Sequence, residues 1–144
     1  MDECRFEIKP EVVEHLIGYA QHDGNELCGV LTGSQISDRV FRVSKVSPPC
    51  VVSNSRCGCV RDAEMANEFI TNDYEDSERT RSYIGEWHTH PEPFPTPSET
   101  DYQSIIGNFE TSKHVFPFLV MIIVGTEDLY MWIYDGECFV RHEM

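Results

Sequence analysis

The sequence predicts a single α+β domain over residues 1–144, in which a mixed, mostly antiparallel β-sheet is flanked by helices. Three observations support this prediction. The chain has 144 residues, 40% of them hydrophobic, which is enough for one packed core. Segments with the 3.6-residue period of a helix occur between short segments of strand length that are apolar or alternate in polarity. No internal repeat and no low-complexity segment interrupts them.

Helical periodicity occurs in three segments. The first covers residues 10–22 and starts with a proline suited to a first helical turn, and the second covers residues 62–74. A third helix is expected over residues 100–112, with Ser98 or Thr100 as its N-cap. The apolar stripes comprise Val12, Val13, Leu16, Ile17 and Ala20 in the first helix and Ala63, Ala66, Phe69 and Ile70 in the second.

Strand-like segments fill most of the remaining chain. They comprise residues 26–33, 40–48, 82–90, 118–125, 129–136 and 137–144. We expect a turn at Gly33-Ser34 and loops over residues 47–59 and 91–99. The acidic run over residues 73–78 is predicted to be a solvated connector. Aromatic side chains expected in the core or along one face of the sheet are Trp87, Tyr130, Trp132 and Tyr134.

The formal net charge of −14 restricts the classes of partner. Nucleic-acid backbones and anionic membrane surfaces are bound by Lys and Arg, so this charge disfavours both. A basic or neutral protein partner is more compatible with it. The N-terminal segment carries acidic residues where a signal peptide carries basic ones, and no apolar run is long enough to span a bilayer. We therefore expect a cytoplasmic protein.

The chain contains six cysteines: Cys4, Cys28, Cys50, Cys57, Cys59 and Cys138. In a cytoplasmic protein an even count does not imply disulfides, and we expect reduced thiols. A second metal site formed by Cys50, Cys57 and Cys59 is an alternative. The C-x-C spacing is tighter than that of a usual structural zinc pair, and no fourth ligand is obvious, which favours thiols without a metal role.

Four residues near the middle of the chain predict a metal site. His88 and His90 are two positions apart on a predicted strand, so their side chains point to the same face. Prolines end this strand, and a helix that begins near Ser98 places Asp101 on the same side as Ser98. Two imidazoles and one carboxylate with an open fourth position are typical of catalytic zinc. We predict one zinc ion per chain, held by His88, His90 and Asp101.

Catalysis at such a site requires further groups. Zinc lowers the pKa of a bound water to about 7, which makes hydroxide available to attack a carbonyl. Ser98 is placed to stabilise the resulting oxyanion by a hydrogen bond. A general base is also needed, and glutamate is the usual choice. The two candidates are Glu26, at the start of the first strand, and Glu86, on the same strand face as His88.

These residues resemble the signature of the JAMM metalloproteases, also called MPN+ or JAB domains. The stretch His88-Thr89-His90-Pro91, then six residues, Ser98, two residues and Asp101 matches the pattern H-[ST]-H-P-x6-S-x2-D. The upstream segment ELCGVLTG, residues 26–33, matches the E-x-x-G-x-L-x-G strand of the family. The resemblance covers nearly the whole chain. It implies a cytidine-deaminase-like sheet flanked by helices, in agreement with the predicted fold class.

The resemblance implies a zinc-dependent isopeptidase or peptidase that cleaves after the C-terminal tail of a ubiquitin-like protein, in deconjugation or precursor maturation. The roles it implies are zinc ligands at His88, His90 and Asp101, general acid/base at Glu26, and oxyanion partner at Ser98. The substrate tail would bind as an extended strand, guided by residues 47–60 and 103–117. The short chain and the GEWHTHP segment are similar to stand-alone bacterial JAB proteins, which are often encoded beside ubiquitin-like conjugation enzymes, including in antiphage operons of the CBASS type.

Two alternatives of other kinds stay open. A catalytically silent MPN-type module would bind a partner without cleaving it, although such modules typically lack the metal residues that this chain keeps. A zinc hydrolase acting on another amide or acyl bond, in a sulfur-carrier protein or a cell-wall peptide, would have the same site chemistry. The missing signal-peptide pattern disfavours the cell wall as substrate.

Overall fold

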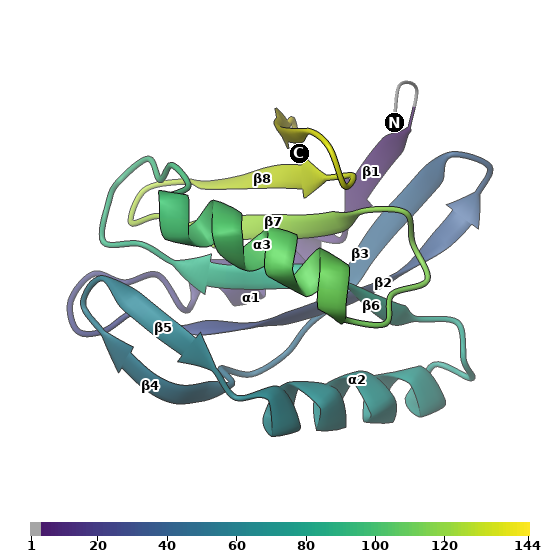
Figure 1. The fold of residues 1–144 in the computed structure, drawn as a ribbon, viewed down its shortest axis with the longest axis horizontal. Helices are drawn as coiled ribbons and strands as arrows, with labels where there is room; N and C mark the ends of the chain where they lie inside the picture. The colour runs from purple at the N-terminus through teal and green to yellow at the C-terminus, as the bar shows by residue number, and fades with distance from the viewer. Residues whose placement is uncertain (1–3) are drawn as a thin grey trace.

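A computed structural model describes residues 4–144. Its helices and strands, in chain order, are β1 (Arg5–Ile8), α1 (Pro10–Ile17), β2 (Cys28–Ser37), β3 (Val40–Val46), β4 (Val51–Ser55), β5 (Gly58–Arg61), α2 (Ala63–Asp76), β6 (Ser82–Thr89), α3 (Glu99–Thr111), β7 (Leu119–Val124), β8 (Leu129–Tyr134) and β9 (Phe139–His142). Seven strands form one sheet in the order β1-β3-β2-β6-β7-β8-β9, and β4 and β5 form a separate hairpin (Figure 1).

The large sheet is mixed and mostly antiparallel. The pairs β1–β3 and β6–β7 are parallel, whereas the other four pairs of neighbours are antiparallel. The sheet is also strongly curled. Phe6 in β1 packs edge-on against His142 in β9 with ring centroids 5.2 Å apart, although these strands are the two edges of the sheet. The predicted fold class is confirmed.

Helices cover both faces of this sheet. On one face α1 packs Val12 and Leu16 into a core cluster that contains the fully buried Trp87. On the other face α2 and α3 contribute Ala66 and Ile105 to a second cluster. Alternate residues of β7 enter the two clusters, which explains its uninterrupted apolar sequence. The predictions for the aromatic residues are confirmed: Trp87 is core, and Tyr130, Trp132 and Tyr134 all pack on the second cluster.

The three predicted helices are present with shifted ends. The first stops at Ile17 rather than at residue 22, and the backbone bonds that follow are of the tighter i→i−3 kind. Ile17 is therefore 56% exposed instead of buried on the apolar stripe. The second helix begins after Asp62, whose side chain accepts the backbone N–H of Met65 at 3.1 Å. Among the described residues, no helix is both long and apolar enough to cross a membrane.

Strand β2 differs from its prediction at both ends. It begins at Cys28, so Glu26 precedes the strand rather than opening it. It also continues through Gly33 to Ser37, and the chain turns only afterwards. Gly33 marks a close approach of β3 and not a turn, because a Cβ atom at this position would clash with the backbone carbonyl of Arg42.

The loop predicted over residues 47–59 is wrong over most of its length, since it contains β4 and the start of β5. The two strands pair antiparallel, with Asn54 opposite Cys59. Most side chains of β4 are exposed, so the hairpin lacks the alternation of apolar and polar residues that identifies a strand in a sequence. The short edge strand β1 also lies outside the predicted strands.

The solvated connector predicted over residues 73–78 is wrong at Asp73, which is buried in the last turns of α2. Its carboxylate accepts two hydrogen bonds from Arg81, at 2.9 and 2.6 Å, and one from the hydroxyl of Thr32 at 2.6 Å. Burial raises the pKa of Asp73, but these hydrogen bonds outweigh burial and lower it. The ion pair connects α2 to the segment that enters β6, and the Thr32 hydrogen bond connects α2 to β2.

We expect Asp73→Ala to lower the free energy of unfolding by about 3 kcal/mol, because the Arg81 guanidinium loses its buried partner. The matched control is Glu75→Ala in the same helix, which removes an exposed pair with Arg79 and should cost less than about 0.5 kcal/mol. Since the pKa of Asp73 is lowered, its contribution should be complete above the ordinary value of about 3.9 and be lost as the pH falls below it. Urea denaturation at pH 7 and pH 3 measures both effects; equal losses for the two variants at pH 7 would contradict the assignment.

Candidate metal centre

Strand β6 carries two histidines to one end of the sheet. His88 lies opposite Cys28 of β2 and is flanked on its other side by Ile123 of β7. His90 follows directly after the strand, and its backbone N–H donates to the carbonyl of Val124 at 2.9 Å. The extended backbone is therefore maintained through both residues, and their side chains lie on the same face of the sheet.

Helix α3 delivers the third residue of the predicted cluster. Of the two predicted N-caps, Ser98 and Thr100, the structure has Ser98, which forms a capping box with Asp101. The Ser98 hydroxyl accepts the backbone N–H of Asp101 at 3.1 Å, while the backbone N–H of Ser98 donates to Asp101 Oδ2 at 2.9 Å. The helix cap thus fixes the position of the Asp101 carboxylate.

The three predicted metal ligands converge. His88 Nε2 and His90 Nε2 are 3.1 Å apart, and Asp101 Oδ2 lies 3.2 Å from the first and 3.1 Å from the second. Ligand atoms of a tetrahedral zinc site, each about 2.0–2.1 Å from the ion, are separated by about 3.3 Å. In residues 4–144 no other group of His, Cys, Asp and Glu residues could hold a metal ion in this way.

Glu92 also lies at this site, although it was not among the predicted residues. Its Oε1 lies 2.8 Å from Nδ1 of His90 and accepts a hydrogen bond from that nitrogen. Because Nδ1 faces Glu92, Nε2 is the ring nitrogen that faces the cluster, and it would bind a metal ion after losing its own proton. Burial lowers the pKa of His90, but the hydrogen bonds to Asp101 and Glu92 outweigh it and raise the pKa to about 9. The signal in the sequence is the carboxylate two positions after the second histidine.

Glu26 lies close to the cluster and is buried, with 6% of its surface exposed. Burial raises the pKa of its carboxyl, while the nearby His88 and His90 act in the opposite direction. Its carboxylate takes part in no hydrogen bond or ion pair with any residue from 4 to 144. Both backbone groups of Glu26, in contrast, bind the β4–β5 hairpin.

Glu86, the second candidate base, is in a different environment. One of its carboxylate oxygens pairs with Arg61 and the other accepts a hydrogen bond from Asn108. Burial raises the pKa of Glu86, and the charge of Arg61 opposes this effect. The structure therefore separates the two glutamates: the carboxylate of Glu26 is unpaired, whereas both oxygens of Glu86 are occupied.

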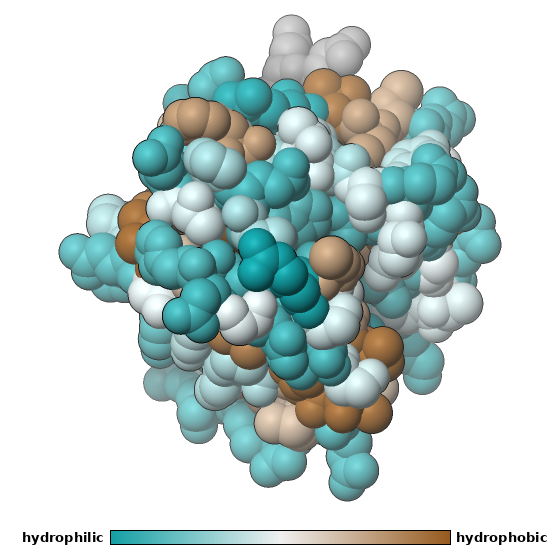
Figure 2. Space-filling model, turned by 90° about the vertical axis from the view of Figure 1, so that its left-hand side faces the viewer, coloured by the Kyte–Doolittle hydropathy of each residue, from teal (hydrophilic) through white to brown (hydrophobic). Residues whose placement is uncertain are grey.

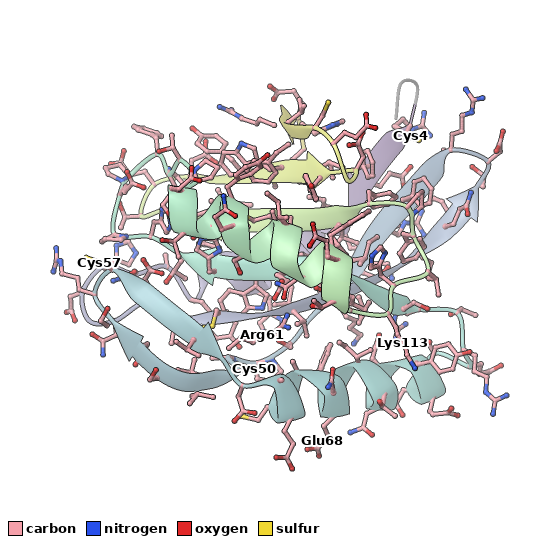
Figure 3. All side chains as sticks on the ribbon, in the orientation of Figure 1. Cys4, Cys50, Cys57, Arg61, Glu68 and Lys113 are labelled. Atoms are coloured by element: carbon pink, nitrogen blue, oxygen red, sulfur yellow. A yellow bond between two sulfur atoms is a disulfide. The ribbon has the colours of Figure 1, made fainter. Side chains whose placement is uncertain are left out.

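A cavity of about 580 Å³ opens beside the metal cluster and is lined by both glutamates and by Ser98. It lies between the hairpin and α3, and Arg61 points from β5 toward α3 across this space (Figure 3). Figure 2 looks at the end of the molecule where β6 finishes and α3 begins, and the surface there is mostly hydrophilic with small, separate apolar patches. A second cavity of about 380 Å³, between α1, β3 and α2, contains none of the predicted site residues.

The cysteines are not all reduced, which corrects the prediction from composition. Cys28 and Cys59 form a disulfide that joins β2 to β5. The thiols of Cys4, Cys50, Cys57 and Cys138 are free. The alternative of a second metal site at Cys50, Cys57 and Cys59 is also not supported, because Cys59 is bonded to Cys28. The interpretation of Cys28 as a buried strand residue is confirmed, with 7% of its surface exposed.

Comparison with known families agrees with this geometry. The family model of prokaryotic homologs of the JAB domain matches residues 9–135, which include the metal cluster and both glutamates. The chain belongs to the prokaryotic JAB-domain family. The resemblance drawn from the H-[ST]-H-P-x6-S-x2-D motif is thereby confirmed.

Two relatives of this JAB-domain protein share the name CD-NTase/cGAS isopeptidase. The protein from Vibrio cholerae is 30% identical over 131 residues, which cover 90% of this chain and 81% of that protein. The protein from Escherichia coli strain TW11681 is 30% identical over 127 residues, which cover 86% and 78%. The solution structure of a protein from Desulfitobacterium hafniense shares the fold, with a TM-score of 0.67, 17% identity, and coverage of 96% of this chain and 90% of that one.

We expect Glu92→Ala to weaken Zn²⁺ binding by about ten- to a hundredfold, because His90 loses the group that fixes its ring and its tautomer. Glu92→Gln, which retains an oxygen acceptor for the Nδ1 proton, should lose less affinity. Competition with a chromophoric chelator measures both values. The exposed Glu99 on the first turn of α3 offers a matched control, and equal affinities for Glu92→Ala and Glu99→Ala would show that Glu92 does not orient the ligand.

Proposed function

We propose that this JAB-domain protein is a zinc-dependent isopeptidase or peptidase that cleaves after the C-terminal tail of a ubiquitin-like protein, or of a protein conjugated in a similar manner. One observation carries the proposal: a buried glutamate without a side-chain partner in residues 4–144 lies beside three converging metal ligands at an open cavity. Two imidazole nitrogens and one carboxylate are a donor set that fits Zn²⁺ and leaves one position open. When bound, zinc supplies a Lewis acid that lowers the pKa of water and polarises a carbonyl.

The names of the relatives suggest the class of conjugate. Both are CD-NTase/cGAS isopeptidases, so we propose that this chain releases a CD-NTase from an amide bond to a target protein, in antiphage defence. A formal charge of −14 suits a partner with a basic or neutral surface around the cleaved tail.

Glu26 is the group that we assign to proton transfer. A general base must have a free carboxylate within reach of the attacking water, and burial should bring its pKa toward the working pH. The unpaired and buried carboxyl of Glu26, with its raised pKa, meets these conditions. It takes a proton from water as oxygen attacks the scissile carbonyl, and then donates this proton to the leaving amine.

Ser98 is the oxyanion partner in this proposal. Its hydroxyl oxygen accepts the backbone N–H of Asp101, so the hydroxyl proton remains available to another acceptor. Ser98 also lines the cavity. A hydrogen bond from this hydroxyl to the developing oxyanion stabilises the transition state more than the ground state.

The cavity suggests how the tail reaches the site. One wall is formed by the turn and second strand of the hairpin, within residues 57–61, and the other by Ser104 and Asn108 of α3. Except for Arg61, these walls belong to the segments 47–60 and 103–117, which were expected to guide an extended substrate. We propose that the tail lies between them, with its scissile bond at the metal cluster.

We expect Glu26→Gln to lower kcat by about 10²–10⁴-fold while zinc stays bound, because the variant lacks only the proton carrier. Glu86→Gln, which keeps an oxygen acceptor for Arg61, should lower kcat less than about tenfold. Cleavage of a purified conjugate between the CD-NTase tail and a lysine peptide, followed by mass spectrometry, measures both rates. An active Glu26→Gln together with an inactive Glu86→Gln would reverse the assignment.

Metal removal tests the zinc requirement. We expect one zinc per chain by elemental analysis and less than about one-tenth as much in His88→Ala, since a three-ligand site loses a third of its donors. Chelation should abolish cleavage, and added zinc should restore it. Full cleavage by a metal-free protein would refute the zinc mechanism. A folded wild-type protein that binds the tail, but does not bind zinc and does not cleave the conjugate, would favour the silent binding module.

A further inference from the structure

The residue that we assign as base lies outside the sheet that positions the two histidines. Glu26 precedes β2, and its backbone hydrogen bonds go to β4 of the hairpin instead. Its N–H donates to the carbonyl of Ser55 at 2.8 Å, and its carbonyl accepts the Nδ2–H of Asn54 at 2.8 Å. Both backbone groups of Glu26 are thus held by two neighbouring residues of one exposed strand.

A covalent bond holds the same two segments together. The disulfide joins Cys28, two residues after Glu26, to Cys59 in β5. Within the hairpin Cys59 pairs directly with Asn54, the residue whose side chain binds Glu26. Cys59 and Asn54 are therefore cross-strand neighbours, and they hold Cys28 and Glu26, which are two residues apart at the start of β2.

The hairpin itself buries little apolar surface, and its other attachments are polar. Four of the five side chains of β4 are exposed, and an isolated two-stranded hairpin is only marginally stable in water. Its other attachments are the Arg61–Glu86 ion pair at the end of β5, a hydrogen bond from Gln21 to the carbonyl of Arg56 in the turn, and one from Asn25 to the side chain of Asn54. Directly before β4, the backbone N–H of Cys50 also donates to the carbonyl of Cys28 at 2.8 Å. A segment with so little buried apolar area opens easily unless a cross-link restrains it.

We propose that the β4–β5 hairpin positions Glu26 for proton transfer, with Asn54 as the positioning residue and Cys28–Cys59 as a latch whose redox state sets the turnover rate. The role of Glu26 rests on the proposed function. Cys59 is the more exposed partner, so a dithiol reductant attacks there. Its thiolate bonds to Cys59 Sγ, and Cys28 Sγ leaves and takes up a proton. The second thiol of the reductant then displaces Cys59, which leaves two protein thiols and the reductant as a disulfide.

Hydrogen exchange tests the attachment without any activity. We expect the Glu26 amide to exchange at least tenfold faster after reduction with a phosphine than in the oxidised protein, because the hydrogen bond from this amide to Ser55 opens more often. The Cys59→Ser variant should show the same increase. Cys57→Ser is the matched control, since it removes a free, exposed thiol from the same hairpin and should leave the exchange unchanged. Unchanged exchange at Glu26 in reduced protein and in Cys59→Ser would overturn the proposal, whatever the activity.

Turnover tests the consequence in the zinc-loaded protein. Reduction, Cys59→Ser and Asn54→Ala should each lower kcat at least fivefold with little change in KM or zinc affinity, whereas Ser53→Ala on the same strand should not. A purely structural loss would lower the zinc affinity or raise KM as well. If Glu26→Gln is inactive but kcat is the same in oxidised and reduced protein, the redox latch is refuted. If Glu26→Gln is fully active, the proposed function fails, and the exchange result alone decides whether the hairpin holds this segment.

Discussion

The site is built around a single carboxylate oxygen. Oδ2 of Asp101 lies within 3.2 Å of both histidine nitrogens and also accepts the backbone N–H of Ser98 at the start of α3. This contact joins the end of a central strand to the beginning of a helix that covers the sheet. Burial raises the pKa of Asp101, but the hydrogen bonds from His88 and His90 outweigh it and hold the pKa well below its usual range, so the carboxylate stays charged.

Two glutamates near this oxygen show how environment separates residues of the same chemistry. Glu86 is on the strand of the histidines, yet its charge is neutralised by Arg61 and its second oxygen is bound to Asn108. Glu26 comes from a segment far away in sequence and lies near both histidines without a side-chain partner among the described residues. Proximity along the chain is thus a poor guide to which carboxylate can exchange a proton, and the hydrogen-bond partners decide it.

The sequence predicted the parts of the molecule whose patterns are local and strong. The cluster of His88, His90 and Asp101 was predictable because strand alternation and a helix cap bring these residues together at fixed spacing. The hairpin was missed because its side chains face solvent, and β2 was cut short because Gly33 marks a close backbone contact and not a turn. The Cys28–Cys59 bond could not be predicted, since it depends on a tertiary contact between a strand and a segment predicted to be a loop.

The capping box has a consequence for how this fold can diverge. The side chains of Ser98 and Asp101 cap a helix as well as line the site, whereas the imidazoles of His88 and His90 make no hydrogen bond to the backbone in the described residues. A descendant that abandoned metal chemistry could replace either imidazole at small cost to folding, but losing the serine or the aspartate would leave the first turn of α3 uncapped. A serine and an aspartate three residues apart can therefore be retained for helix capping after catalytic activity is lost. Their presence alone does not indicate whether a related chain cleaves a substrate.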